Sequence, residues 1–289
     1  DLRIWDGITN PVNQEVATID EDFTTPTYTW TNPLSSTEIS ITGGKVVATA
    51  LPIDNDDRLY MDIGSALSDT KWLAQGKFNF VSTTSARAFT PFAITDTTGF
   101  INTGGDTIAI YLHDNTGTPE LELISYDAGV QDASQSTGIT IAYATDYWWT
   151  LIRTSATTVT LSVYSDSTRN TQVGVTITMS GVNTTIDSLR YIQTGSVDQA
   201  NATDVCSYTL DDVKVWDGLT SPNAEGRKVV FTDNAFDEDA VEYASETVSY
   251  DPINGDWTGY VKIPSLATGA DTTIQMYYDY TPDATPSYV

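Results

Sequence analysis

The chain has 289 residues, with 39 Asp and Glu against 13 Lys and Arg, so its formal net charge is −26. That charge argues against nucleic-acid binding, and no apolar run of roughly 18 residues or more is present to cross a bilayer as a helix. The chain has a single cysteine, Cys206, and a single histidine, His113. These counts exclude a disulfide framework, cysteine-based zinc sites, multi-histidine metal centres and most Ser/His/Asp triads.

Alternating apolar and polar residues, the period of β-strands, recur along most of the chain. Thr37–Ile41 and Lys45–Ala50 flank the Gly43-Gly44 turn and predict a hairpin. The other strands expected in this part are Lys77–Val81, Ala88–Ile94, Thr107–Leu112, Leu121–Tyr126, Ile139–Ala142, Trp148–Arg153, Thr157–Tyr164, Gly174–Met179, Ser188–Gln193 and Tyr208–Trp216. The only helical turn expected lies near Asp62–Asp69. Short strands separated by polar turns predict an all-β chain that folds as an antiparallel β-sandwich.

A change of composition marks a second unit. Residues 221–226 are expected to be a linker between a sandwich at 15–220 and a small β domain at 227–289. Residues 1–14 are expected to be a leading strand or the end of a preceding module. The strands expected in the small domain are Arg227–Thr232, Val241–Tyr250, Gly259–Ile263 and Thr272–Tyr280.

The chain contains an internal repeat. Leu2–Pro11, LRIWDGITNP, aligns with Val213–Pro222, VKVWDGLTSP, with Trp, Asp, Gly, Thr and Pro identical and the other positions conservative. The spacing of 211 residues suggests that one sandwich ends at Asp217 and another, largely missing, ends at Asp6. A strand followed by a turn that recurs by chance is the alternative. Trp5 and Trp216 occupy equivalent positions and are expected to be structural.

Three features of residues 22–217 resemble a known class of sandwich. They are the opening Glu21-Asp22-Phe23, the Tyr147–Arg153 hairpin with Val159–Asp166, and the closing strand Tyr208–Trp216. In these features the chain resembles the concanavalin A-like, or laminin-G-like, jelly-roll domains of extracellular adhesins and carbohydrate-active enzymes. The resemblance implies a jelly-roll β-sandwich and an extracellular, cell-surface or virion-surface location.

The C-terminal part carries a separate resemblance. Val229–Asp233, Glu246–Asp251, Tyr260–Leu266 and Ile274–Tyr278 resemble the second half of DUF2341-type β domains, which flank laminin-G-like modules. The strands that open that family are replaced here by the linker. This piece is therefore expected to dock on the sandwich or to borrow a strand from a neighbour.

A glycoside hydrolase needs two carboxylates flanking the scissile bond, about 5–10 Å apart. No Glu-x-Asp-x-Glu run exists. Glu120 and Glu122 share one face of a strand and are the nearest match, but they read better as exposed strand-end charges. His113 reads as a strand-end polar residue and Cys206 as a small buried hydrophobe. The sequence therefore favours a non-enzymatic protein.

A structural Ca²⁺ ion is the cofactor that the acidic clusters suggest, because Ca²⁺ takes six to eight oxygen ligands, often from loops. The clusters are Asp20–Asp22, Asp54–Asp57 and Asp211-Asp212. In the resembled sandwiches the first and last strands meet, and a calcium ion can sit there. The resemblance therefore implies Asp22, Asp211 and Asp212 as ligands. Capping of turns by the same acids is the alternative.

Sugar binding requires exposed aromatic rings that stack on pyranose faces. The candidates are Tyr28, Trp30, Trp72 and Tyr147, and one ring of the Trp148-Trp149 pair must point inward by alternation. A place in the core is the alternative for each.

These features predict a non-enzymatic extracellular module that recognises glycans or cell-surface components within a multi-domain adhesin or viral fibre. The alternative is a structural subunit or spacer of a virion, filament or surface layer, and a glycoside hydrolase is disfavoured. The expected partners are glycans or cell surfaces and neighbouring domains or copies of the same protein. Neither nucleic acid nor membrane insertion is expected.

Overall fold

The computed structural model describes residues 17–53, 57–83, 89–99, 104–114, 118–197 and 204–218, and the backbone of five strands beyond them. The chain divides into two compact units, one of which is Ala17–Ser221. The described residues form strands, turns and bends without a helix, so the helical turn predicted at Asp62–Asp69 is wrong. None of them forms a segment that could span a membrane as a helix. The predicted segment 1–14 and the predicted linker 221–226 lie outside the described residues.

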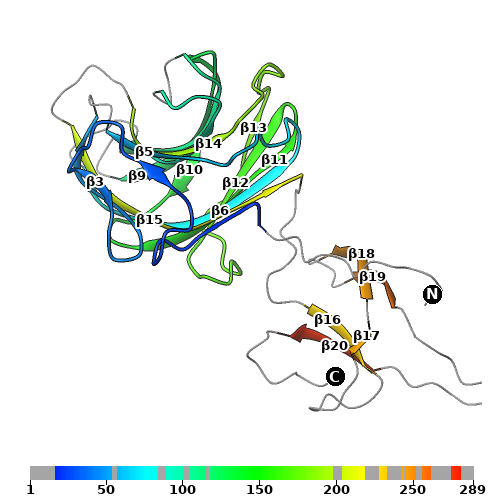
Figure 1. The fold of residues 1–289 in the computed structure, drawn as a ribbon. Coiled ribbons are helices and arrows are strands. Elements are labelled where there is room, and N and C mark those ends of the chain that lie inside the picture. The colour runs from blue at the N-terminus through cyan, green and yellow to red at the C-terminus, as the bar shows by residue number, and fades with distance from the viewer. Residues whose placement is uncertain are drawn as a thin grey trace, which may run out of the picture. The chain divides into compact units, whose positions relative to one another are not determined.

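The first unit consists of two antiparallel sheets that lie face to face (Figure 1). The eight-stranded sheet contains β1 (Ile19–Glu21), β3 (Ile39–Ile41), β4 (Val46–Pro52), β6 (Trp72–Thr83), β11 (Asp146–Ser155), β12 (Thr158–Tyr164), β13 (Ile177–Ser180) and β15 (Val205–Asp217). The seven-stranded sheet contains β2 (Trp30–Thr31), β5 (Arg58–Asp62), β7 (Phe89–Thr95), β8 (Thr107–Asp114), β9 (Pro119–Asp127), β10 (Val130–Thr140) and β14 (Tyr191–Ser196). The predicted all-β antiparallel sandwich is confirmed.

The strand order explains how the sandwich closes. The eight-stranded sheet runs β13-β12-β11-β6-β15-β4-β3, and β1 pairs with β15. The seven-stranded sheet runs β10-β9-β8-β7-β14-β5-β2. β15 thus lies in the middle of its sheet: it pairs with β6 along one edge, and with β4 and then β1 along the other. β15, the last strand of the sandwich, therefore joins the two parts of the eight-stranded sheet, β6-β11-β12-β13 and β3-β4.

Most expected strands are present at about the predicted places. The Gly43-Gly44 hairpin is confirmed: both glycines have positive φ, 61° and 74°, where a β-carbon is disfavoured. β1, β2 and β5 were not predicted. These strands have only three, two and five residues. The alternation of apolar and polar residues that identifies a strand cannot be recognised over so few positions.

The core lies between the sheets and is built from alternate residues of each strand. Trp149 and Phe92 face each other from opposite sheets, with ring centroids 4.5 Å apart. Gly76, directly opposite Trp149 on β6, provides the room for the indole ring: a β-carbon there would lie 2.5 Å from Trp149 Cζ2. Cys206 on β15 is fully buried, as predicted, and burial raises the pKa of its thiol.

A buried carboxylate shapes the loop that follows β1. Glu21 has no exposed surface, and its Oε1 accepts the Phe23 N–H at 2.9 Å. Its Oε2 accepts the N–H groups of Thr27 and Tyr28, each at 3.2 Å. Three backbone donors that the loop would otherwise leave unpaired are thereby satisfied. The Glu21-Asp22-Phe23 motif therefore has a structural function.

The buried guanidinium of Arg153 forms hydrogen bonds to the backbone of two further connections between strands. Arg153 has no exposed surface and donates hydrogen bonds to the carbonyl oxygens of Ser155, Ala156 and Ile186 at 3.3, 2.9 and 2.9 Å. Burial lowers the pKa of Arg153. The side chain ties the β11–β12 turn to the segment before β14, which lies in the opposite sheet.

The second unit is described only as strands. β16 (Lys228–Thr232) lies between β17 (Glu242–Tyr243) and β20 (Gln275–Tyr280) in a three-stranded antiparallel sheet. β18 (Ser245–Asp251) and β19 (Asp256–Val261) form a two-stranded sheet. These strands match the four predicted for the small β domain, except that the second of the four divides into β17 and β18.

We expect Gly76→Ala to lower the stability of the sandwich. The added methyl overlaps the Trp149 ring, and overpacking of this kind costs about 1–3 kcal/mol. A double-mutant cycle with Trp149→Phe checks the cause. The smaller ring makes room for the methyl, so Gly76→Ala should destabilise the Trp149→Phe background less than the wild type, as measured by urea denaturation. Equal effects in both backgrounds would contradict the assignment.

Candidate functional site

The two faces of the seven-stranded sheet carry different kinds of side chain. Leu59, Met61 and Ile192 point into the core between the sheets. By alternation, Tyr60 and Gln193, which are directly opposite each other on β5 and β14, point to the outer face. This outer face carries a mixture of aromatic, amide and charged groups and is the candidate functional surface.

The part of the outer face on β7, β8 and β9 is filled by its own side chains. Tyr111 and Tyr126 are buried there, with their hydroxyl oxygens 3.2 Å apart, and burial raises the pKa of both phenols. They belong to a second apolar cluster, separate from the main core, formed by Ala93, Ala109, Tyr111, Ile124, Tyr126 and Val197. These rings are not available for stacking on a ligand.

Glu122 lies beside this cluster. It is directly opposite Tyr111 on the neighbouring strand, and its side chain is 7% exposed. The prediction that it is an exposed strand-end charge is therefore wrong. Alternation predicts only that Glu120 and Glu122 share one face of their strand, and the packing over that face cannot be derived from one strand.

The accessible part of the outer face lies on β5 and β14. Tyr60, Asp62, Arg190 and Tyr191 gather there, and we call them the β5–β14 patch. Tyr191 is directly opposite Asp62, and the rings of Tyr60 and Tyr191 meet edge to face at 6.3 Å. Both tyrosines are half-buried, so part of each ring is open to solvent.

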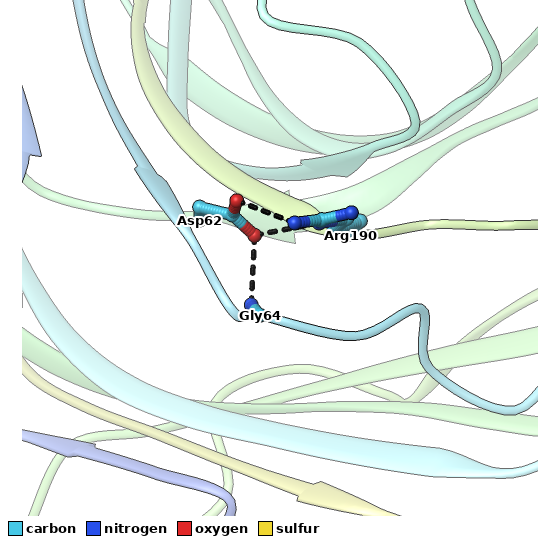
Figure 2. Close-up of polar contacts among 3 residues, drawn as sticks. All are labelled: Asp62, Gly64 and Arg190. Carbon is cyan, nitrogen blue, oxygen red and sulfur yellow. Dashed lines mark hydrogen bonds and ion pairs between the residues drawn. The ribbon is translucent and has the colours of Figure 1, made fainter.

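A fork of hydrogen bonds orders the patch. Arg190 Nε and Nη2 donate to the two carboxylate oxygens of Asp62 at 2.7 and 2.8 Å (Figure 2). Asp62 Oδ1 also accepts the Gly64 N–H at 2.7 Å, so the carboxylate is held from both sides. The guanidinium lies 5.7 Å from the centre of the Tyr191 ring, a cation–π distance. Asp62, Arg190 and Tyr191 therefore contact one another as one cluster.

The charges within the patch stabilise each other. The Arg190 guanidinium lowers the pKa of Asp62, and the carboxylate raises the pKa of Arg190. Both side chains are about two-fifths exposed, at 43% and 42%, so water screens the pair. The pair therefore presents polar edges to solvent but adds little net charge.

A buried amide anchors the segment next to the patch. Gln193 is fully buried, and its Nε2 donates to the carbonyl oxygens of Thr97 and Gly99 at 2.6 and 3.1 Å. Its Oε1 is buried without a hydrogen-bond partner. Arg58 adds a second anchor, since its Nε and Nη2 reach the Thr98 oxygen at 3.0 and 2.7 Å. Residues 97–99 are therefore bonded to Gln193 of β14 and to Arg58 of β5, beside the patch.

The structure does not gather the four predicted sugar-binding rings. Trp72 has no exposed surface, and Tyr147, 7% exposed, packs on Phe78 and accepts the Ala142 N–H with its hydroxyl. Neither can offer a ring face, because alternation turns both toward the core; the prediction is wrong for these two. Trp149 is the inward ring of the tryptophan pair.

Tyr28 and Trp30 are partly buried against the core. Trp30 lies on the edge strand β2 opposite Met61, an inward residue, and its ring is 5.4 Å from that of Phe23. The Tyr28 hydroxyl donates to the Thr18 carbonyl oxygen. A role of these two rings in ligand binding stays a prediction, and they do not belong to the β5–β14 patch.

The predicted meeting of the first and last strands is confirmed, because β1 pairs with β15. The acids at this junction have other partners. Asp22 accepts hydrogen bonds from the Thr24 N–H and hydroxyl, which lower its pKa, and Asp211 pairs with Lys77 at 2.8 Å. Asp212 is exposed, at a positive φ of 51°. Calcium binding at these acids stays a prediction.

In the part of the chain that the structure describes, no group of three or more His, Cys, Asp and Glu side chains is arranged to hold a metal ion. Trp216, 5% exposed, is structural as predicted. Trp5, Asp54 and the side chain of His113 lie outside the described residues.

The β5–β14 patch was not found from the sequence. Asp62 and Arg190 are 128 positions apart, and only the pairing of β5 with β14 brings them together. A signal was present in the alternation of Leu59 and Met61 with Tyr60 and Asp62. The short strand follows an Asp-rich cluster, and the helical turn predicted at Asp62–Asp69 begins at its last residue.

No known protein family matches the chain, and no curated protein does. Among solved structures, Bacteroides ovatus GH43B of a xyloglucan PUL is similar, with a TM-score of 0.50 and 11% identity over 75% of this chain and 41% of that chain. The VIP36 exoplasmic/lumenal domain in its Ca²⁺/Man3GlcNAc-bound form gives 0.41, at 13% identity over 70% and 89%. The CBM2 module of the evolved Dit of Lactobacillus casei BL23 phage J-1 gives 0.44, at 12% identity over 71% and 97%.

Identities this low show the fold alone. The sandwich resembles concanavalin A-like lectin folds, as the sequence predicted. The likeness therefore does not choose between cleavage and binding. The DUF2341-type assignment of residues 227–289 stays a prediction.

We expect Asp62→Asn to lower the melting temperature slightly at pH 7. Because the pKa of Asp62 is lowered in the folded state from its usual 3.8, the stability that it contributes is present above that value. This contribution to stability is lost as the pH falls through the pKa that Asp62 has in the folded protein. Melting curves should therefore differ at pH 7 and converge as the pH falls below 3.8 and through the lowered pKa of the folded state, and the difference should be smaller in an Arg190→Gln background. A difference that persists at low pH would show that the ion pair is not its cause.

Calcium is tested in the same assay. A bound ion raises the melting temperature because it binds only the folded state. If Asp22, Asp211 and Asp212 hold Ca²⁺, millimolar CaCl₂ raises the melting temperature of the wild type more than an equal ionic strength of NaCl does. The extra rise should be absent in Asp212→Asn and reversed by EDTA. Identical curves in CaCl₂, NaCl and EDTA would rule out the site.

Proposed function

We propose that the sandwich is a non-enzymatic module that recognises glycans on cell surfaces, within an extracellular multi-domain adhesin or viral fibre. The observation that supports this is the β5–β14 patch. It combines two half-exposed tyrosines, Tyr60 and Tyr191, with the ordered Arg190–Asp62 fork on one face of a rigid sheet. Stacking surfaces beside fixed hydrogen-bonding groups are what a pyranose ring requires.

The proposed ligand is an uncharged glycan. The net charge of −26 repels sulfated or uronic-acid polymers, and the one guanidinium in the patch is already neutralised by Asp62. Neutral sugars bind through ring stacking and hydrogen bonds, which this charge does not oppose. Binding should therefore depend only weakly on salt.

Two features favour binding without cleavage. Among the described residues of the patch, Asp62 is the only carboxylate, and it is occupied by Arg190 and Gly64. Glu122, the acid nearest to the hydrolase pattern, is buried against the tyrosine cluster on β8 and β9. Neither arrangement supplies a free acid and a free base on the two sides of one sugar bond.

The test is a glycan array that contains neutral and anionic glycans, probed with the full chain. We expect binding to neutral glycans and a loss of about tenfold in affinity for Tyr60→Ala and Tyr191→Ala, roughly the contribution of one stacked ring. Tyr164→Ala is the matched control, because Tyr164 is a half-buried tyrosine of β12 in the other sheet. It should bind like the wild type.

Three results would contradict the proposal. Equal loss in all three variants would mean that the patch is not the site. Release of oligosaccharides from a bound polysaccharide, abolished by Glu122→Gln, would identify an enzyme. No binding to any glycan, together with ordered self-assembly, would instead identify a structural subunit or spacer.

A further inference from the structure

The two tyrosines of the β5–β14 patch form a corner and not a flat platform. Tyr60 and Tyr191 are diagonal neighbours on adjacent strands, since Tyr60 is opposite Gln193 and Tyr191 is opposite Asp62. Their ring planes cross at 89°, with the centroids 6.3 Å apart. An extended run of sugar rings stacks on aromatic faces that point in about the same direction. These two rings do not provide such a pair.

Contacts within the patch occupy part of the tyrosine surface. The Arg190 guanidinium lies over the Tyr191 ring, 5.7 Å from its centre, and is held there by Asp62. In an edge-to-face pair, the edge of one ring also covers a face of the other. Whichever ring supplies the edge, the faces that remain point in different directions. The patch therefore offers a stacking face to a single sugar ring.

The sheet surface next to the patch is closed on the β7 side. Thr95 and Ala93 are the neighbours of Tyr191 and Gln193 on β7, and both are fully buried, as is Gln193. Residues 97–99 are bonded to the Gln193 amide through two carbonyl oxygens. A glycan chain that lies on the tyrosines cannot continue across the sheet in this direction, because no exposed side chain follows them on β7.

The opposite side of the patch is open. β2 is the edge strand of this sheet, and its Thr31 is directly opposite Tyr60 and half-exposed. Thr31 points to the outer face by alternation, since its neighbour Trp30 packs against the core. The patch is thus accessible over a small side chain at the edge of the sheet and blocked on its inner side.

The Arg190–Asp62 fork suits a sugar residue with free neighbouring hydroxyls. Both side chains are partly exposed, so an accepting carboxylate and a donating guanidinium reach solvent side by side. Two adjacent hydroxyls of one sugar satisfy both groups when one donates to Asp62 and the next accepts from Arg190. A residue inside a glycan chain has lost a hydroxyl to the next linkage. The residue at the non-reducing end keeps all but the anomeric one.

We propose that the β5–β14 patch binds the residue at the non-reducing end of a neutral glycan, and not an internal segment of a polysaccharide. The end residue stacks in the corner of Tyr60 and Tyr191, its hydroxyls bond to the fork, and the rest of the glycan leaves over β2. The free end is the non-reducing one because the reducing end of a cell-surface glycan is bonded to its carrier. This inference rests on the proposed function and names the part of the glycan that the same site takes.

The first experiment is an array of neutral disaccharides to hexasaccharides, each immobilised in two orientations and probed with the full chain. Attachment through the reducing end leaves the non-reducing end free, and attachment through the non-reducing end hides it. We expect binding in the first orientation and a loss of at least about tenfold in the second, where stacking and the fork contacts are both lost.

The array separates failure of this inference from failure of the proposed function. Equal or stronger binding in the second orientation, abolished by Tyr60→Ala, overturns the inference and leaves the proposed function standing. Binding in neither orientation, or binding that Tyr60→Ala and Tyr191→Ala leave unchanged, overturns the proposed function and this inference with it.

Chain length gives a second readout. Each oligosaccharide has one non-reducing end, so the molar Kd of a free hexasaccharide should lie within about twofold of that of the disaccharide of the same sugar. Isothermal titration calorimetry with the sugar that the array selects measures both. A site for internal segments gains contacts with each added residue, so a Kd that falls steadily with length contradicts the inference.

Thr31→Trp tests the exit of the glycan over β2. The new ring lies beside Tyr60, where the second sugar emerges, and should strengthen disaccharide binding by roughly fivefold while monosaccharide binding stays unchanged. Thr178→Trp is the matched control, because Thr178 is an exposed threonine of β13, the edge strand of the other sheet. It should bind like the wild type. No gain in Thr31→Trp, or an equal gain for both sugars, contradicts this exit.

Discussion

The sandwich depends on the pairing of β15 with β6. β15 lies between β6 and β4, so without it the eight-stranded sheet separates into a β6-β11-β12-β13 half and a β3-β4 half, and β1 has no partner. Bulges let one long strand serve all three neighbours: its register with β6 shifts between Asp211 and Lys214, where Asp212 adopts a positive φ. The pairing of β15 thus fixes the positions of β1, β4 and β6 relative to one another.

Cations are few in this acidic chain, and three of those in the sandwich link separate strands. Lys77 joins β6 to Asp211 of β15, Lys214 joins β15 to Asp20 of β1, and Arg190 joins the start of β14 to β5. Arg153 is buried and donates hydrogen bonds to three backbone carbonyl oxygens. Glu21 and Glu122 are buried, whereas the negative charge that lies on the surface repels other copies of the chain.

The sequence predicted the architecture better than the site, for a physical reason. Long strands such as β6, β9 and β11 show their alternation over many residues, and the prediction that one ring of the Trp148-Trp149 pair points inward followed from it. The patch depends on two short segments, Tyr60 with Asp62 and Arg190 with Tyr191, which only the sheet order brings together. The burial of Glu122 could not be predicted for the same reason, because it depends on packing over the sheet and not on the residues of its own strand.

The single thiol of the chain sits inside the strand on which the sandwich depends. Cys206 is fully buried in β15, and burial raises its pKa, so the folded protein presents no thiolate to an alkylating reagent. Reaction becomes fast only when β15 separates from β4 and β6. The rate at which a thiol-specific dye modifies the native protein therefore measures how often the closing strand detaches, without any engineered label and at temperatures far below melting.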